Sequence, residues 1–138
     1  MDSPVELHYI KPEELQEYWD LIRPGLETVR NNAGDGWIAE DIYYALKSKQ
    51  SSLHLAYHGQ EYVGFVVLTP IQHYDCKHLH IWCAYNIGEK EILELVIPQL
   101  EAMAKSIGAR KLTFGSPRKW DRRLKDFTPV RTIYEKEV

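Results

Sequence analysis

His78-Leu-His-Ile-Trp-Cys-Ala-Tyr85 is an apolar, aromatic run with the length of a β-strand. A turn at 86–88, a segment with helical spacing of apolar residues at 89–107 and a second short strand at 111–114 follow it. A strand, a long helix and a strand most often form a right-handed crossover between two parallel strands. The loop that leaves the first strand then meets the helix N-terminus, where backbone N–H groups and the helix dipole favour an anion. This unit predicts a parallel strand pair with a ligand at the start of the helix.

The remaining elements follow from apolar periodicity and from turn residues. A first strand at Val5–Ile10 leads into a helix that begins at Pro12 and is interrupted by Pro24-Gly25. Pro98 lies inside the 89–107 segment and predicts either a kink or two shorter helices. The other expected elements are a helix at 37–49, a β-hairpin with strands at 51–58 and 61–70, a short helix at 119–125 and a final strand at 129–138. The expected fold class is α/β (α+β): one domain over 1–138, with a mixed, mostly antiparallel sheet flanked by helices.

The composition, with 44% hydrophobic and 27% charged residues, is typical of a soluble globular domain. No apolar run approaches the ~20 residues of a membrane span, and the first residues carry no basic or apolar signal segment. We therefore expect no membrane contact and a cytoplasmic location. The net charge of −3 argues against nucleic acid as a partner, although 110–125 holds seven basic residues against one acid. That basic segment suits the phosphates of a cofactor, a nucleic acid or an acidic protein, or is simply a solvated surface.

Three stretches resemble the GNAT superfamily of acyl-CoA-dependent N-acyltransferases. They are the hairpin from Ala56 to Val67 with its Val63-Gly64-Phe65 sequence, the run from Ile81 to Lys90 with the helix after it, and the segment from Ser116 to Phe127. In the family these positions hold the two central strands, the acyl-CoA motif, and the C-terminal helix with its turn. The resemblance covers most of the chain and implies a GNAT-like sheet whose fourth and fifth strands are parallel and bridged by a long helix. It also implies acetyl-CoA as cofactor and an amine, on a small molecule or a protein, as acceptor.

The family's phosphate loop is Arg/Gln-x-x-Gly-x-Gly/Ala, and the matching turn here has a single glycine, Gly88. The resemblance assigns cofactor binding to the first strand, this turn and the basic segment, at Trp82, Cys83, Ala84, Ile87, Gly88, Glu89, Lys90, Ser116, Arg118 and Trp120. Acids in a first helical turn also stabilise a helix without any ligand, so Glu89 and Glu91 have a structural explanation as well.

An acyltransferase of this kind has to hold the thioester, remove a proton from the acceptor ammonium and stabilise the oxyanion. Strands that splay around Trp82–Tyr85 would release a backbone N–H for the oxyanion. His80 has the side chain of a base that works near neutral pH, and Tyr85 or Tyr134 would protonate the leaving thiolate. The alternative for His80 is a structural role, since it alternates with other ring side chains on one strand face.

A narrower pattern is similar to divergent GNAT-like proteins carried by tailed bacteriophages: Trp82…Tyr85, Ser116-Pro-Arg118…Trp120 and Tyr134-Glu135. The position of a helix tyrosine that is an acid in many family members holds Arg123 or Leu124 here, and the family's Gly-Phe is Asp126-Phe127. Two functions therefore stay open. One is an N-acetyltransferase with an altered acyl-CoA motif. The other is a GNAT-fold protein without catalysis that serves as a phage accessory, virion or protein-interaction component, with a phage or host protein as partner and the host cytoplasm or the virion as location.

Six metal-capable side chains lie close together in the sequence: His73, Asp75, Cys76, His78, His80 and Cys83. None of their pairs has zinc-finger spacing. Strand alternation also predicts that His80 and Cys83 point to opposite faces of the sheet. From the sequence we therefore expect no metal site.

Overall fold

The computed structural model describes residues 5–33, 36–88, 91–116, 124 and 126–138. Five strands form one sheet in the order β1-β2-β3-β4-β5. Their bounds are β1 Val5–Ile10, β2 Ser52–His58, β3 Glu61–Gln72, β4 Lys77–Asn86 and β5 Lys111–Phe114. Neighbouring strands are antiparallel except for β4 and β5, which run in the same direction. The predicted mixed sheet with one parallel pair is confirmed.

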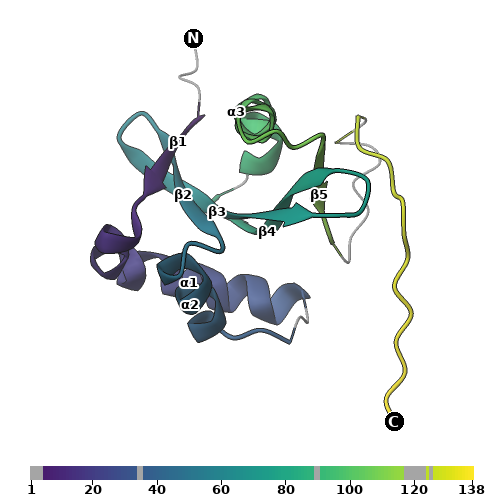
Figure 1. Ribbon diagram of the computed structural model, residues 1–138. Helices are drawn as coiled ribbons and strands as arrows, with labels where there is room; N and C mark the ends of the chain where they lie inside the picture. Colours follow the sequence, from purple (N-terminus) through teal and green to yellow (C-terminus); the bar gives the residue numbers. More distant parts are fainter. Residues whose placement is uncertain (1–4, 34–35, 89–90, 117–123, 125) are drawn as a thin grey trace.

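Helices cover both faces of this sheet (Figure 1). A 3-10 turn, η1 at Pro12–Glu14, leads directly into α1 at Leu15–Ala33; α2 is Ala39–Lys47 and α3 is Ile92–Ser106. α1 and α2 lie on one face, whereas α3, which joins β4 to β5, lies on the other. α3 continues through Pro98 as one helix, so the alternative of two shorter helices is wrong. This crossover brings β5 beside β4 in parallel.

The sheet is buried on both faces because its strands direct alternate apolar residues toward two separate cores. On the α3 face, Val66 of β3 belongs to one cluster with Val96 of α3. On the opposite face, Phe65 of β3 belongs to a second cluster with Ile22 of α1 and Ile42 of α2. All five side chains are fully buried, so the central strand β3 contributes to both cores.

A β-bulge distorts the β2–β3 hairpin at Val63. Two adjacent residues of β2 pair with Tyr62 and Gly64 of β3, so Val63 has no partner across the hairpin. Gly64 has a φ of +153°, and a Cβ on it would overlap the carbonyl oxygen of Tyr85 on β4. Only glycine allows this close approach of the two strands.

A second bulge lies in β4 at Trp82. Two adjacent residues of β3 pair with Ile81 and Cys83, so Trp82 is an extra residue between two rungs of the ladder. Ile81, before the bulge, belongs to the cluster on the α3 face, whereas Cys83, after it, belongs to the cluster on the α1 and α2 face. The prediction that His80 and Cys83 point to opposite faces is therefore wrong, because it assumed unbroken alternation along the strand.

α1 runs unbroken through Pro24 and Gly25, so the predicted interruption is wrong. Pro24 lacks the N–H that a helix interior uses, but Ile22 and Leu26 on either side of it are fully buried. A Cβ on Gly25 would come within 2.6 Å of the Tyr85 ring on β4. This tight docking of α1 on the sheet outweighs the cost of ~3 kcal/mol that a proline carries inside a helix.

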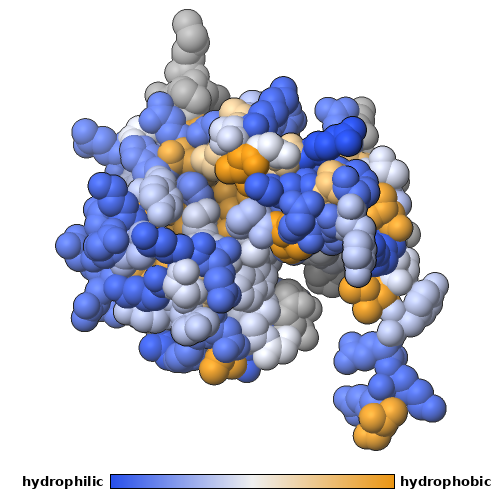
Figure 2. All heavy atoms as spheres, viewed as in Figure 1, coloured by the Kyte–Doolittle hydropathy of each residue, from blue (hydrophilic) through white to orange (hydrophobic). Residues whose placement is uncertain are grey.

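The predicted final strand at 129–138 is also wrong. These residues pair with no strand in the part of the chain that the structure describes, and they form a tail that leaves the domain (Figure 1). Figure 2 shows the tail as a projection that carries isolated apolar residues, among them the exposed Val130 and Ile133. Alternating β-type residues do not make a strand unless a sheet edge and a face to bury receive them.

The expected short helix at 119–125 falls almost entirely outside the described residues. Among the helices that the structure does describe, none combines the length and the apolarity that a membrane crossing requires.

The close approach at Gly64 predicts a large effect of a small substitution. We expect Gly64→Ala to lower the free energy of unfolding by about 3 kcal/mol or more, because the new methyl group meets backbone and the residue keeps a positive φ. Urea unfolding measures this effect. Gly36→Ala is the matched control: no atom lies within 4 Å of its added Cβ, so its effect should stay within about 0.5 kcal/mol. Equal stabilities of the two variants would contradict the proposed role of Gly64.

Candidate active site

The parallel pairing of β4 with β5 is short. It joins His78–Ile81 to Lys111–Phe114, and β4 then continues to Asn86 against β3 alone. We call Trp82–Asn86 the open end of the parallel pair. In an antiparallel ladder, alternate backbone N–H and C=O groups point away from the partner strand. At the open end, the N–H and C=O groups that face away from β3 therefore point toward the side on which β5 pairs with the first half of β4.

The loop after the open end is anchored to β3 and leads to α3. The N–H of Ile87 donates to the carbonyl of Val63 at 2.8 Å, and Asn86 Nδ2 donates to the carbonyl of Gly88 at 3.2 Å. Gly88 has a φ of +90°, and among the described residues no atom lies within 4 Å of the place where its Cβ would be. Gly88 is thus an exposed backbone turn directly before the helix.

The N-terminus of α3 carries two opposing electrostatic contributions. Its first N–H groups have no partner within the helix and bear the positive end of the dipole. Glu91 is the N-cap residue and Glu94 lies in the first turn, so two carboxylates offset part of that positive field. The predicted cofactor residues Glu89 and Lys90 lie outside the described residues.

His80 lies one rung before the end of the parallel ladder. It pairs with Thr113 of β5, and its ring Nδ1 is 2.9 Å from Thr113 Oγ1. Both side chains are on the α1 and α2 face, because Ile81 and Phe114 beside them pack on the α3 face. Thr69 of β3 lies opposite His80. Thr69, His80 and Thr113 therefore form a short polar strip across the sheet, next to the open end.

The pKa of the His80 imidazole is lowered from its ordinary value of 6.5. The largest cause is burial, which disfavours the charged ring, and the neighbouring His73 and His78 add to the shift. A lowered pKa means that the ring is neutral at physiological pH and able to accept a proton.

The structure brings four of the predicted residues together at the open end: Trp82, Cys83, Ala84 and Tyr85. The rings of Tyr85 and Phe65 have centroids 5.6 Å apart, and Gly25 of α1 packs closely against both of them. The Trp82 ring meets Trp37 edge-on at 6.3 Å between centroids. Both aromatic rings are thus held in place by the α1 and α2 face.

Two of the other predicted residues that the structure describes, Ser116 and Tyr134, are exposed. Tyr134 is 90% exposed on the tail, so the structure does not place it in the half-buried surroundings of Tyr85. Ser116 is exposed just beyond the end of β5. Arg118 and Trp120 lie outside the described residues. On the β5 side, Phe114 is covered instead by Phe127, with ring centroids 5.3 Å apart.

The hydrogen bond between His80 and Thr113 was not predicted from the sequence. It depends on the register of a parallel pair, which periodicity along one strand does not reveal. The available signal was that Thr113 is the one neutral polar residue in the otherwise apolar Leu112–Phe114 run.

No protein-family model and no curated protein sequence matches the chain. Solved structures match it over nearly its full length. A probable acetyltransferase is 14% identical with a TM-score of 0.68, and the match covers 96% of this chain and 97% of that one. A GNAT family acetyltransferase from Staphylococcus aureus is 12% identical with a TM-score of 0.65 and full coverage of both chains. An aminoglycoside acetyltransferase from an uncultured soil metagenomic sample, in complex with sisomicin, is 14% identical with a TM-score of 0.65, covering 96% of this chain and 97% of that one.

The chain has the GNAT fold. At these identities the likeness establishes the architecture, and the chemistry has to be argued from this chain's own residues. Two observations on this GNAT fold suit an acyl-CoA: the outward backbone groups of the open end, and the exposed turn at Gly88 before a helix N-terminus. The carboxylates of Glu91 and Glu94 oppose a phosphate there, each by roughly 1 kcal/mol at surface dielectric. The open end therefore fits the extended arm of an acyl-CoA well, whereas the turn at Gly88 fits its phosphates less well.

The surroundings of His80 predict its titration. In an NMR titration of its ring signals, we expect a pKa below 6.5, because burial and two neighbouring histidines disfavour its charged form. In the variant His73→Gln the value should move up toward 6.5, since one repelling group is removed. A His80 that titrates above 6.5 in the unchanged protein would contradict this assignment.

Proposed function

We propose that this protein is an N-acyltransferase that moves an acetyl group from acetyl-CoA to an amine. The observation that carries the proposal is the open end of the parallel pair, where β4 extends beyond its pairing with β5 and its outward backbone groups lie close to a histidine with a lowered pKa. The enzyme has to bind an extended thioester and deprotonate an amine next to it. The open end and His80 offer both functions on adjacent parts of one strand.

Binding would use the backbone more than side chains. Edge groups of Trp82–Asn86 would pair with the amide-containing arm of the cofactor as a further strand would. The turn at Gly88 and the first N–H groups of α3 would receive its phosphates. The segment that contains Ser116, Arg118 and Trp120 would add cationic and aromatic contacts from the β5 side.

Catalysis would use His80 from the α1 and α2 face. When bound, the cofactor supplies an activated thioester carbonyl. With Nδ1–H donated to Thr113, Nε2 of His80 carries the lone pair that takes a proton from the acceptor ammonium. A backbone N–H at the Trp82 bulge donates to the carbonyl oxygen as negative charge develops on it. Transfer would form a bond from the amine nitrogen to the carbonyl carbon, release the nitrogen's second proton to solvent and break the carbon–sulfur bond, so a residue of this chain would have to give the leaving thiolate a proton.

Tyr85 is the better candidate for that last proton. Its ring is held at the open end by Phe65 and Gly25, whereas Tyr134 lies on the exposed tail. A fixed hydroxyl loses less conformational freedom on reaching the sulfur than a hydroxyl on an unpaired segment does. We therefore assign the acid to Tyr85 and give Tyr134 no part.

The acceptor class follows from the same face. The acceptor would have to reach His80 on the α1 and α2 face, where Trp82 of the same strand packs against Trp37, and we propose a polyamine, an amino sugar or a peptide N-terminus. The bound sisomicin of one structural neighbour is an amine of that kind. The resemblance to phage-carried proteins, and a phage or host partner with it, stays a prediction.

Cofactor binding gives the first test. We expect acetyl-CoA to raise the melting temperature in a thermal-shift titration, since a ligand at 100 times its Kd stabilises a protein by about 2.7 kcal/mol. Gly88→Asp should weaken this binding by about fivefold or more, because one more carboxylate then faces the phosphates. Gly88→Asn, which has the same shape without the charge and strains the backbone equally, should bind more tightly than Gly88→Asp.

If millimolar acetyl-CoA leaves the melting temperature unchanged, the proposed activity is wrong. The alternative of a GNAT-fold protein without catalysis would then be favoured. Equal affinities of the Asp and Asn variants would keep the cofactor but move its phosphates away from Gly88.

Turnover gives the second test, with acetyl-CoA and either sisomicin or a short peptide as acceptor and release of free thiol as readout. His80→Gln should lower kcat/KM by about 10²-fold or more, in the range for loss of a general base, with an unchanged melting temperature. In the unchanged protein, kcat/KM should fall as the pH drops through the lowered pKa of His80. His8→Gln is the control, an exposed histidine on β1 that should keep full activity. Undiminished turnover of His80→Gln would take His80 out of the mechanism.

A further inference from the structure

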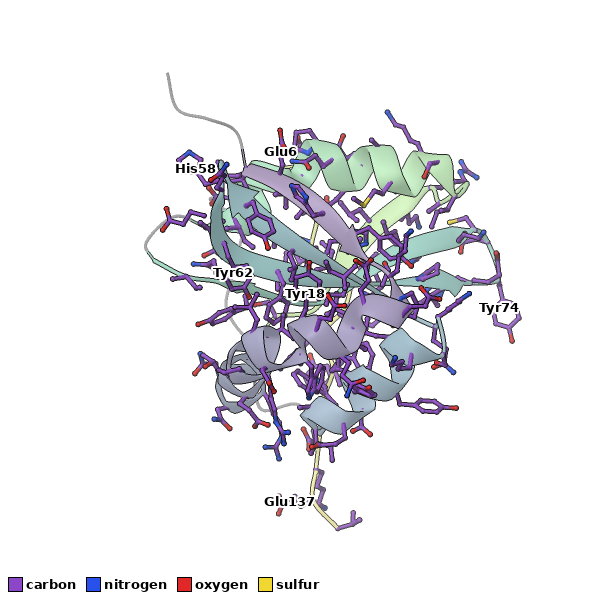
Figure 3. All side chains as sticks on the ribbon, turned by 90° about the vertical axis from the view of Figure 1, so that its left-hand side faces the viewer. Glu6, Tyr18, His58, Tyr62, Tyr74 and Glu137 are labelled. Atoms are coloured by element: carbon purple, nitrogen blue, oxygen red, sulfur yellow. The ribbon has the colours of Figure 1, made fainter. Side chains whose placement is uncertain are left out.

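The turn between β3 and β4 gathers three different metal-ligating side chains. One donor atom each of Asp75, Cys76 and His78 lies within 4.8 Å of the other two. The N–H of His73 donates to the carbonyl of Cys76 at 3.0 Å and closes the turn. Tyr74 in the same turn points away from the domain (Figure 3) and is not one of the ligating side chains.

We propose that this turn is a binding site for Zn²⁺ or a similar borderline transition-metal ion. A thiolate, an imidazole and a carboxylate are the donor types that zinc takes in proteins, whereas Mg²⁺ and Ca²⁺ require oxygen donors alone. The site belongs to a different part of β4 from the open end and does not depend on the acyltransferase activity.

The side chains are already close to ligating geometry. In a tetrahedral zinc site neighbouring ligand atoms are roughly 3.3–3.8 Å apart, and the three donor atoms here lie within 4.8 Å of one another, so closure onto a metal would need side-chain movements of about 1 Å or less. Cys76 is 9% exposed and follows Asp75 directly in the chain, so two of the donors lie close together. His78 Nε2 is shielded from solvent and has no hydrogen-bond partner among the described residues.

The fourth position has an obvious occupant. The ring of His73 stacks on that of His78 with 3.9 Å between centroids, so rotation of its side chain would bring a second imidazole to the metal. A water molecule would fill the position otherwise. Two cations oppose the metal: Lys111 Nζ lies 3.5 Å from Asp75 Oδ2, and Arg131 of the tail acts on His78. A bound metal would therefore displace Lys111 from Asp75.

Sequence reasoning excluded a metal here on ligand spacing. The spacing of zinc fingers is set by their own loops and does not apply to a four-residue connection between antiparallel strands. Gln72 and Lys77 are paired across the sheet, so the chain between them has to fold back and bring its side chains together.

The test uses the full chain, stripped of metal with a chelator and then titrated with Co²⁺. We expect one equivalent to bind with a thiolate-to-cobalt charge-transfer band, and Zn²⁺ to abolish the band by displacement while excess Mg²⁺ does not. Cys76→Ser should lose the band. Cys83→Ala is the matched control, because Cys83 is the chain's other buried cysteine and lies away from the turn, so the band should remain.

A second variant tests the site independently in case Cys76→Ser does not fold. His78→Gln keeps the thiol and should weaken Co²⁺ binding at least tenfold, whereas His8→Gln on β1 should leave it unchanged. Circular dichroism checks that each variant is folded. Absence of the charge-transfer band in the unchanged protein, or a band that survives Cys76→Ser, would overturn the proposal.

Discussion

The extra residue at Trp82 is the constraint on which the rest of the structure depends. A β-strand directs alternate side chains to opposite faces, and one inserted residue reverses that assignment for everything beyond it. Ile81 contributes to the core under α3, and Cys83, two positions later, contributes to the core under α1 and α2. The bulge follows directly after Ile81, the last residue of β4 that pairs with β5. The side chains of β4 therefore exchange faces at the same place where its pairing with β5 ends.

Two glycines hold Tyr85 at the open end that this produces. Gly64 allows β3 to approach the Tyr85 carbonyl, and Gly25 allows α1 to approach the Tyr85 ring. A side chain at either position would push apart two elements that both contact this residue. The strand beyond the bulge is therefore fixed from the sheet side and from the helix side, although β5 does not pair with it there. Such an edge is rigid enough to present backbone groups to a ligand in a defined direction.

The sequence predicted the elements whose signal is local, and it failed where the deciding contact was distant. The strand run His78–Tyr85, the helix after it and the parallel return were all found, because each has its own periodicity. Pro24 was assigned as a helix break by its local cost, which the burial of Ile22 and Leu26 outweighs. The segment 129–138 alternates like a strand but has no edge to join. The bulge at Trp82 leaves no trace in composition, so the faces of His80 and Cys83 could not be assigned correctly.

The two proposed sites share one column of histidines along β4 and the turn before it. Burial is the largest cause of the lowered pKa of His80, and His73 and His78 add to it, so the turn is electrostatically coupled to the base beside the open end. A metal ion on His78 would add positive charge close to His80 and would favour its neutral form. The pairing of His78 with Lys111 also begins the parallel ladder that ends at Ile81. An ion at the turn would thus influence the proposed base through charge and through the strand pairing that positions it, without contacting any substrate.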